Sequence, residues 1–161
     1  NLECHNLAVP GASNVKILDM ILNFQFEPND LIIVQWTFSE RDLIFLDECQ
    51  SKVIDIHNKE SIPYYELHPD YDLKFRSWLH INHAYSYLKN KNLRFYFSFN
   101  SVVFEFLKNR PSWTSEISFI DRTIYSFNME DKFPLADDRM HPGIKCHDVF
   151  AEYFVKEILS N

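Results

Sequence analysis

The apolar positions along the chain alternate between short runs typical of strands and longer stretches with the spacing of helices. This spacing predicts helices over about 14–23, 70–90 and 143–159, and a short helix over 102–107. Strands are predicted over 2–9, 31–34, 53–56 and 93–99, whereas 117–127 fits either a strand or a loop. The alternation of strands and helices indicates an α/β domain with a mainly parallel sheet.

Two details of the pattern predict where the core lies. The segment 31–34 is continuously apolar, which is typical of a parallel strand buried on both faces. The helix over 70–90 is expected to bury Phe75, Trp78, Leu79, Tyr85 and Leu88. The C-terminal helix is expected to bury Ile144, Phe150, Ala151, Phe154, Val155, Ile158 and Leu159.

Length, charge and composition narrow the classes of protein to which the chain can belong. With 161 residues it fits a single domain, residues 1–161. A net charge of −7 disfavours nucleic acid as a partner, because an acidic surface repels phosphates. No apolar run is long enough to span a bilayer, so no membrane partner is expected. The three cysteines have no CxxC spacing and no signal peptide is visible, which favours thiols in a reducing setting, either cytoplasmic or virion-associated.

In a parallel α/β sheet, sites form at the carboxyl ends of the strands, and this directs attention to the loops 10–14, 36–42 and 133–143. In the last loop, Asp138 precedes His141 by three residues. An aspartate so placed can bond the Nδ1–H of the histidine and leave Nε2 free as a base. A capping aspartate beside a surface histidine is the alternative interpretation.

The two other loops also allow two interpretations each. Gly11 precedes a predicted helix, so its backbone N–H can point at an anion, or the turn is an ordinary one capped by Ser13. The segment 35–42 carries polar residues out of an apolar strand, as either a site or a solvated loop. His80 and His83 have the spacing of metal ligands, but no third ligand is indicated, so a helix surface is favoured and no metal is expected.

Taken together and in order, three segments of the chain resemble the SGNH (GDSL-like) hydrolase superfamily. They read NLAVPGASN, DLIIVQWTFSERD and DDRMHPGIKCHDVFAEYFVKEIL. The resemblance implies a three-layer α/β/α sandwich with a mainly parallel, flavodoxin-like sheet. The stretch from Asp47 to Asp131 matches only as a generic α/β pattern.

The resemblance also implies roles for individual residues. Asp138 corresponds to the acid of a catalytic triad and His141 to its general base. Gly11 corresponds to the glycine whose N–H helps to form the oxyanion hole, and Asn14 follows it in the same oxyanion and substrate-binding block. The family's third block is normally Gly-x-Asn-Asp, whereas this chain has Trp-Thr-Phe-Ser at 36–39. Thr37 or Arg41 is therefore expected to donate to the substrate instead.

The family's nucleophilic serine lies upstream of the glycine block, and no serine precedes Gly11 in this chain. We therefore expect a first βα unit before Asn1, which supplies the central strand and the serine. Another segment that supplies the strand, or a degenerate domain without turnover, is the alternative.

The resemblance implies a serine hydrolase that cleaves a carboxylic ester, such as an acetyl or acyl group on a carbohydrate or small molecule. It needs no metal or organic cofactor. The alternative function is a non-catalytic binding or structural module of a larger assembly, such as a phage virion.

Overall fold

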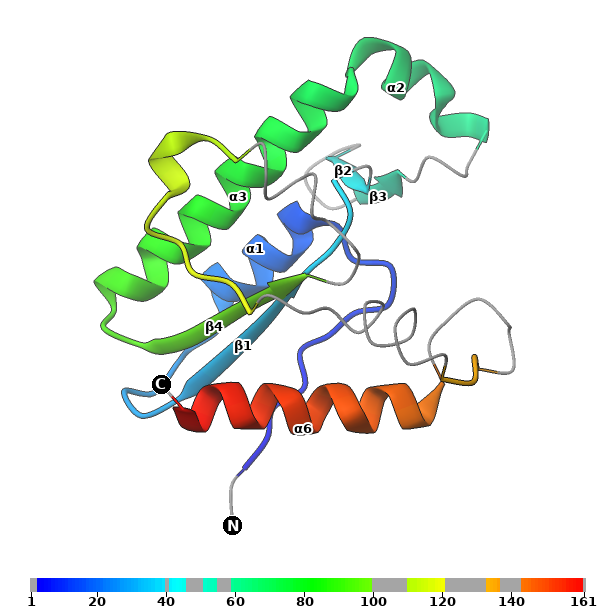
Figure 1. Cartoon of the computed structure of the whole chain (residues 1–161). Helices are drawn as coiled ribbons and strands as arrows, with labels where there is room; N and C mark the ends of the chain where they lie inside the picture. Colours follow the sequence, from blue (N-terminus) through cyan, green and yellow to red (C-terminus); the bar gives the residue numbers. More distant parts are fainter. Residues whose placement is uncertain are drawn as a thin grey trace. The chain divides into compact units, whose positions relative to one another are not determined.

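A computed structural model describes residues 3–39, 41–45, 51–54, 59–99, 110–120, 133–136 and 143–160 of the chain (Figure 1). The chain divides into two compact units, and each is described by itself. Unit 1 consists of Asn1–Pro28 and Thr37–Lys91, and unit 2 consists of Asn29–Trp36 and Asn92–Asn161. The expectation of one domain over 1–161 stays a prediction.

Unit 1 is built on two packed helices. Helix α1 (Asn14–Asn23) packs against the long helix α3 (Asp70–Asn90), which is green in Figure 1. The short strands β2 (Asp42–Phe45) and β3 (Ser51–Ile54) form an antiparallel pair. A 3-10 turn, η1 (Lys59–Ser61), leads into helix α2 (Ile62–Leu67).

Unit 2 holds a parallel pair of strands. Strand β1 (Leu31–Trp36) pairs with β4 (Arg94–Phe99). The 3-10 turn η2 (Ser112–Thr114) follows, and helix α6 (Ile144–Ser160) ends the unit. The helices together with this parallel pair confirm the α/β class.

The helical predictions agree closely with the structure. Helix α1 begins at Asn14 with Ser13 as its N-cap, and α3 spans the same residues that the spacing predicts. Strands β1 and β4 confirm the predictions for 31–34 and 93–99. The predicted short helix over 102–107 lies outside the described residues. In the segment 117–127, Phe119 forms an isolated parallel bridge with Phe97, and 121–127 lies outside the described residues.

Two strand predictions need correction. Residues 3–9 form no strand, and the prediction of a strand over 2–9 is wrong for them, because a strand needs a paired neighbour and none of the described residues pairs with this segment. Strand β1 is not buried on both faces, since Ile32 and Val34 are buried while Leu31 and Ile33 are exposed. Side chains alternate along a strand, so burial follows the one covered face whatever the residue type.

The predicted core faces of the two long helices are only partly right. In α3, Trp78 and Leu88 are buried as expected, but Phe75 and Leu79 are exposed. The 3.6-residue repeat places these two on the side of the helix opposite to the residues that are buried beside Trp78, namely Leu73, Ile81, Ala84 and Leu88.

In α6, Phe154 is buried as expected, whereas Ile144, Ala151, Val155 and Leu159 are exposed. The buried side of this helix centres on Cys146. Phe133, Val149, Phe150 and Tyr153 pack around that cysteine. The apolar residues of α6 therefore occupy a wide part of the helix circumference. Neighbouring segments in the described part of the chain cover only a portion of it.

The core of unit 2 is aromatic. Trp36 is fully buried and meets Phe97 edge to face, with 5.4 Å between ring centroids. Phe99 stacks on Phe119 at 4.9 Å. Helix α6 lies along the strand pair, where the hydroxyl of Tyr96 donates to the carbonyl of Ile158 at 3.4 Å. Edge-to-face and offset ring pairs of this kind add to the stability gained from burial.

The two glycines are required for different physical reasons. Gly11 has a φ of +74°, a left-handed conformation that side chains with a Cβ rarely adopt, although no atom lies within 4 Å of where that Cβ would be. At Gly143, by contrast, a Cβ would lie 2.4 Å from the carbonyl oxygen of Pro134, which also accepts the N–H of Gly143 at 3.1 Å.

This contrast predicts opposite responses to substitution. Asparagine tolerates a positive φ better than alanine, so Gly11→Asn should lose less stability than Gly11→Ala, which should lose about 1 kcal/mol. At Gly143 space is limiting, so Gly143→Ala should cost about 2 kcal/mol and Gly143→Asn more. Urea unfolding of the four variants checks the order. A Gly143→Ala protein as stable as the wild type would contradict this account.

Candidate functional site

A tight turn leads the chain into helix α1. The N–H of Ala12 donates to the carbonyl of Val9 at 3.1 Å, and the positive φ of Gly11 at the third position makes this a type II turn. Pro10 occupies the second position, where its fixed φ is favourable. Ser13 then caps the helix, and its hydroxyl accepts from the N–H of Lys16 at 3.3 Å. Gly11 is exposed, so its backbone is accessible to a ligand.

The first residue of α1 is tied to the loop that follows β1. Asn14 is only 2% exposed, and its side-chain oxygen accepts the N–H of Thr37 at 2.9 Å. Its amide nitrogen donates to the carbonyl of Thr37 at 3.2 Å and to the hydroxyl of Ser77 in α3 at 3.1 Å. A single carboxamide therefore pairs with both backbone groups of Thr37 and joins this residue to two helices.

This bonding determines what Asn14 can do. Both hydrogens of its amide are donated within the protein, so the side chain presents no spare donor to a substrate. We conclude that Asn14 holds Thr37 in place. The sequence pattern identified the position but not this structural task.

Thr37 is the most distinctive polar residue at this junction. It is 8% exposed, and its hydroxyl oxygen is buried without a hydrogen-bond partner among the described residues. A buried hydroxyl left unpaired costs free energy, and such groups in native proteins are usually explained by a water molecule or a ligand. Thr37 is therefore a candidate donor, as the sequence predicts.

Arg41 lies in the same loop. Its N–H donates to the carbonyl of Phe38 at 3.3 Å, and its guanidinium lies 6.0 Å from the centre of the Phe38 ring. The residue is half-buried and follows Thr37 by four positions in the sequence. Its predicted role in binding substrate stays a prediction.

Sequence reasoning missed an ionic cluster around the buried Asp42, at the far end of this loop. The carboxylate of Asp42 accepts from the hydroxyl of Tyr64 and lies 3.1 Å from Nη1 of Arg76, which also donates to that hydroxyl at 2.6 Å. Its second oxygen accepts the N–H of Leu43 at 2.8 Å. Burial, together with the bond to Asp42 and its charge, raises the pKa of Tyr64 above its ordinary value of 10.0. The partners come from α2 and α3, and no spacing in the sequence relates them to Asp42.

His80 lies on α3 beside this cluster. Its Nδ1 is buried and has no hydrogen-bond partner in the part of the chain that the structure describes. Burial lowers the pKa of His80 below 6.5, the charge of Asp42 opposes this shift, and the charges of Arg76 and His83 add to it. The imidazole is therefore neutral near pH 7.

Within the described residues, His80 and His83 are not joined by a third candidate metal ligand. His83 is exposed, whereas His80 is half-buried, so the helix-surface interpretation applies to His83 alone. Among the described residues, no group of three or more His, Cys, Asp or Glu side chains is arranged to hold a metal ion.

A second pairing that the sequence analysis did not identify fixes the junction of α2 and α3. Nδ1 of His68 lies 2.8 Å from a carboxylate oxygen of Asp72, and the His68 ring lies 4.3 Å from the ring of Tyr64. Both members of the pair are partly exposed. The pairing links the end of α2 to the first turn of α3 and supports the ring that contacts Asp42.

The predicted catalytic residues Asp138 and His141 lie outside the described residues. The described chain resumes at Gly143, whose backbone N–H donates to the carbonyl of Pro134 at 3.1 Å. Helix α6 begins at the next residue, Ile144. The proposed pairing of Asp138 with His141 therefore stays a prediction. Gly11, Asn14, Thr37 and Arg41 all belong to unit 1, and the Asn14 bonds bring the helix start and the loop together.

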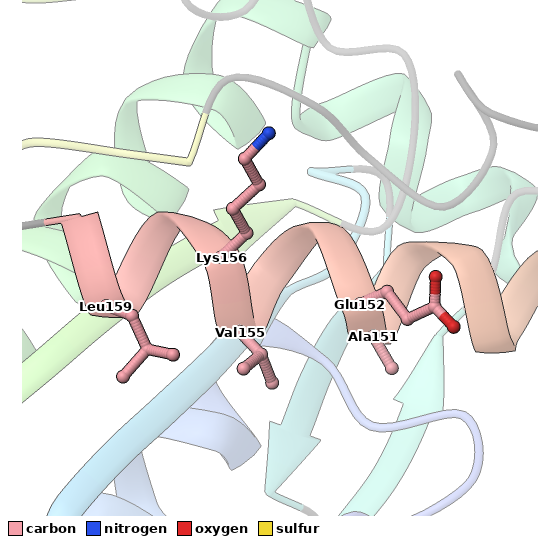
Figure 2. Close-up of a pocket in the computed structure, with 5 residues that line it drawn as sticks. All are labelled: Ala151, Glu152, Val155, Lys156 and Leu159. Carbon is pink, nitrogen blue, oxygen red and sulfur yellow. The ribbon is translucent and has the colours of Figure 1, made fainter.

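A groove on α6 contains none of the predicted site residues. It is lined by Ala151, Glu152, Val155, Lys156 and Leu159. Figure 2 shows that Ala151, Val155 and Leu159 point to one side of the helix and Lys156 to another. The groove is open and mostly apolar, without the converging polar groups expected of a catalytic site.

Two further observations concern the whole described chain. None of the described helices is both long enough and apolar enough to cross a membrane.

Comparison with protein-family models, with curated proteins and with solved structures found no match for this chain.

The role assigned to Asn14 predicts a large effect of a small change. Asn14→Asp keeps the shape but replaces two donors by a carboxylate next to the Thr37 carbonyl. The free energy of unfolding should fall by about 2–4 kcal/mol, because buried acceptors lose their donors and a charge is buried. Urea unfolding measures the change.

Asn6→Asp is the matched control. Asn6 is exposed, and its side chain accepts the N–H of Ala8, which aspartate can also accept. This variant should stay within about 0.5 kcal/mol of the wild type. Equal losses for the two variants would contradict the role of Asn14.

The burial of His80 predicts an acid sensitivity of folding. Above pH 6.5 the imidazole is neutral in both folded and unfolded chains, so the lowered pKa has no effect on stability. Below this pH the unfolded chain takes up a proton that the folded protein resists, so stability falls with falling pH. When the pH is lowered from about 7.5 to about 5, the free energy of unfolding of His80→Gln should fall less than that of the wild type. Urea unfolding at the two pH values measures both changes.

His147→Gln provides the control for this measurement, because His147 is an exposed histidine whose charge is not among the causes of the pKa shift of His80. It should retain the pH dependence of the wild type. If His80→Gln also retained that dependence in full, the buried histidine would not be its source.

Proposed function

We propose that this chain is part of an SGNH-type serine hydrolase that cleaves a carboxylic ester, such as an acyl group on a carbohydrate or small molecule. The proposal includes the finer architecture, a three-layer α/β/α sandwich with a flavodoxin-like sheet. One observation carries it beyond the sequence resemblance. The carboxamide of Asn14 joins the block that contains Gly11 to the block that contains Thr37.

The proposed chemistry assigns each step to a particular group. A serine on the expected first βα unit attacks the ester carbonyl, and His141 takes its proton at Nε2. Asp138 orients His141 through Nδ1, as in other triads. The proton then passes to the leaving alcohol, and water hydrolyses the acyl-enzyme in the same way.

Charge that develops on the carbonyl oxygen needs donors on the opposite side. We assign the backbone N–H of Gly11 and the hydroxyl of Thr37 to this task, with Arg41 contacting the substrate. The exposed turn at Gly11 and the buried, unpartnered hydroxyl of Thr37 support these assignments. Preorganised donors of this kind stabilise a transition state by about 3–4 kcal/mol each. No metal or organic cofactor takes part in these steps.

Hydrolysis of a short-chain nitrophenyl ester by the full-length protein tests the proposal. His141→Ala should lower kcat/KM by about 10²–10⁴-fold, because the variant lacks the general base. His147→Ala is the matched control, since His147 is an exposed histidine of α6 and should leave the rate unchanged. A fluorophosphonate probe should label a serine in the wild type and not in His141→Ala.

Equal rates for the wild type and His141→Ala would remove this residue from the mechanism. If the wild-type protein neither hydrolysed esters nor reacted with the probe, the non-catalytic binding or structural module would be the better interpretation.

A further inference from the structure

The loop 37–42 is held at both ends by consecutive residues of α3. We propose that Arg76, together with Tyr64, is a positioning residue that sets where Arg41 lies relative to the ester substrate. This inference rests on the proposed function for its substrate, but the anchoring itself depends only on the contacts of unit 1.

At the first end of the loop, the anchor is neutral. Ser77 accepts from the amide of Asn14 at 3.1 Å, and that amide pairs with both backbone groups of Thr37. All three residues are buried. Buried hydrogen bonds of this kind fix a backbone strongly, because breaking one leaves unpaired polar groups in the interior.

At the second end, the anchor is ionic. Asp42 is 6% exposed, and its carboxylate meets Nη1 of Arg76 and the hydroxyl of Tyr64. Arg76 also donates to that hydroxyl, so the three side chains form a closed set. The side chain of Arg76 is 38% exposed whereas that of Asp42 is 9% exposed, so removing the arginine would leave a buried carboxylate without its cation.

The two anchored residues, Thr37 and Asp42, are close along the chain. The cluster around Asp42 can therefore affect the position of Arg41. Only four residues separate Thr37 from Asp42, and Arg41 is the neighbour of Asp42. The Arg41 N–H also donates to the Phe38 carbonyl at 3.3 Å, which limits how far Arg41 can move away from Phe38. A displacement of Asp42 is therefore passed to Arg41.

Arginine suits this task better than lysine. One nitrogen of Arg76, Nη1, reaches both the Asp42 carboxylate and the Tyr64 hydroxyl, and the side chain stays charged at every pH at which the protein is folded. Both carboxylate oxygens of Asp42 accept from the protein, and the residue is buried, so the carboxylate is not placed to contact a substrate. The cluster thus acts on the substrate through the loop and not by contact.

The test compares Arg76→Met with Lys74→Met in the full-length protein. Lys74 lies on the same helix and pairs with an exposed carboxylate, Asp70, at 2.6 Å. Arg76→Met should lower kcat for a nitrophenyl ester about 10- to 100-fold while KM changes less than about threefold, since small misplacements cost rate. Hydrogen–deuterium exchange of the 37–42 amides should be at least about tenfold faster in Arg76→Met.

Two milder variants distinguish positioning from general loss of structure. Tyr64→Phe keeps the ring and removes only the hydroxyl, and it should lower kcat about three- to tenfold. Arg76→Lys should recover part of the activity and of the exchange protection that Arg76→Met loses. Lys74→Met should match the wild type in both measurements. If Arg76→Met does not fold, Tyr64→Phe decides the question by the same two measurements.

The two proposals fail in different ways. Exchange of 37–42 that is the same in Arg76→Met and the wild type overturns the anchoring, whatever the esterase result. Faster exchange with an unchanged kcat overturns the positioning role. A wild-type protein that hydrolyses no ester contradicts the proposed function, while the exchange measurement still decides whether Arg76 anchors the loop.

Discussion

The carboxamide of Asn14 is the contact on which the candidate site depends. It pairs with the N–H and the C=O of Thr37 and also donates to Ser77, so three separate segments of unit 1 meet at one buried side chain. No other residue type of this size offers one acceptor and two donors in this geometry. Without it, the loop that carries Thr37 would lose its fixed position at the start of α1.

Helix α3 provides the other polar side chains that hold this loop. Arg76 and Ser77 follow one another on the helix and hold opposite ends of the loop, and His80 lies one turn further on in the field of Asp42. Such a network adds little net stability compared with an apolar core, but it specifies one arrangement, because each partner is costly to leave unpaired. A loop held in this way is preorganised for binding or catalysis.

The elements that the sequence predicts well are those with long, local repeats. Helices over 14–23 and 70–90 follow from their spacing and from the cap at Ser13, because these signals act within a few residues. The two-sided burial expected for 31–34 was wrong, because residue type does not reveal whether one or both faces of a strand are covered.

For the candidate site, the sequence indicated Gly11, Asn14, Thr37 and Arg41 but not their tasks. The resemblance placed these residues in order. However, Asn14 bonds to backbone groups of Thr37, and every residue type has such groups, so the sequence of the loop does not indicate the bonds. The cluster around Asp42 was missed for a different reason, since Tyr64 and Arg76 approach it only through the packing of α2 and α3. Contacts between distant segments require the fold itself.

The most direct test of this account is the exchange rate of a single amide, that of Thr37, followed by NMR in the wild-type protein. If its N–H is donated to Asn14 in a buried setting, exchange should require large-scale unfolding and should be as slow as that of the most protected core amides of α3. A Thr37 amide that exchanges at the rate of an open loop would show that the contact is not formed, and the account of the site would be contradicted.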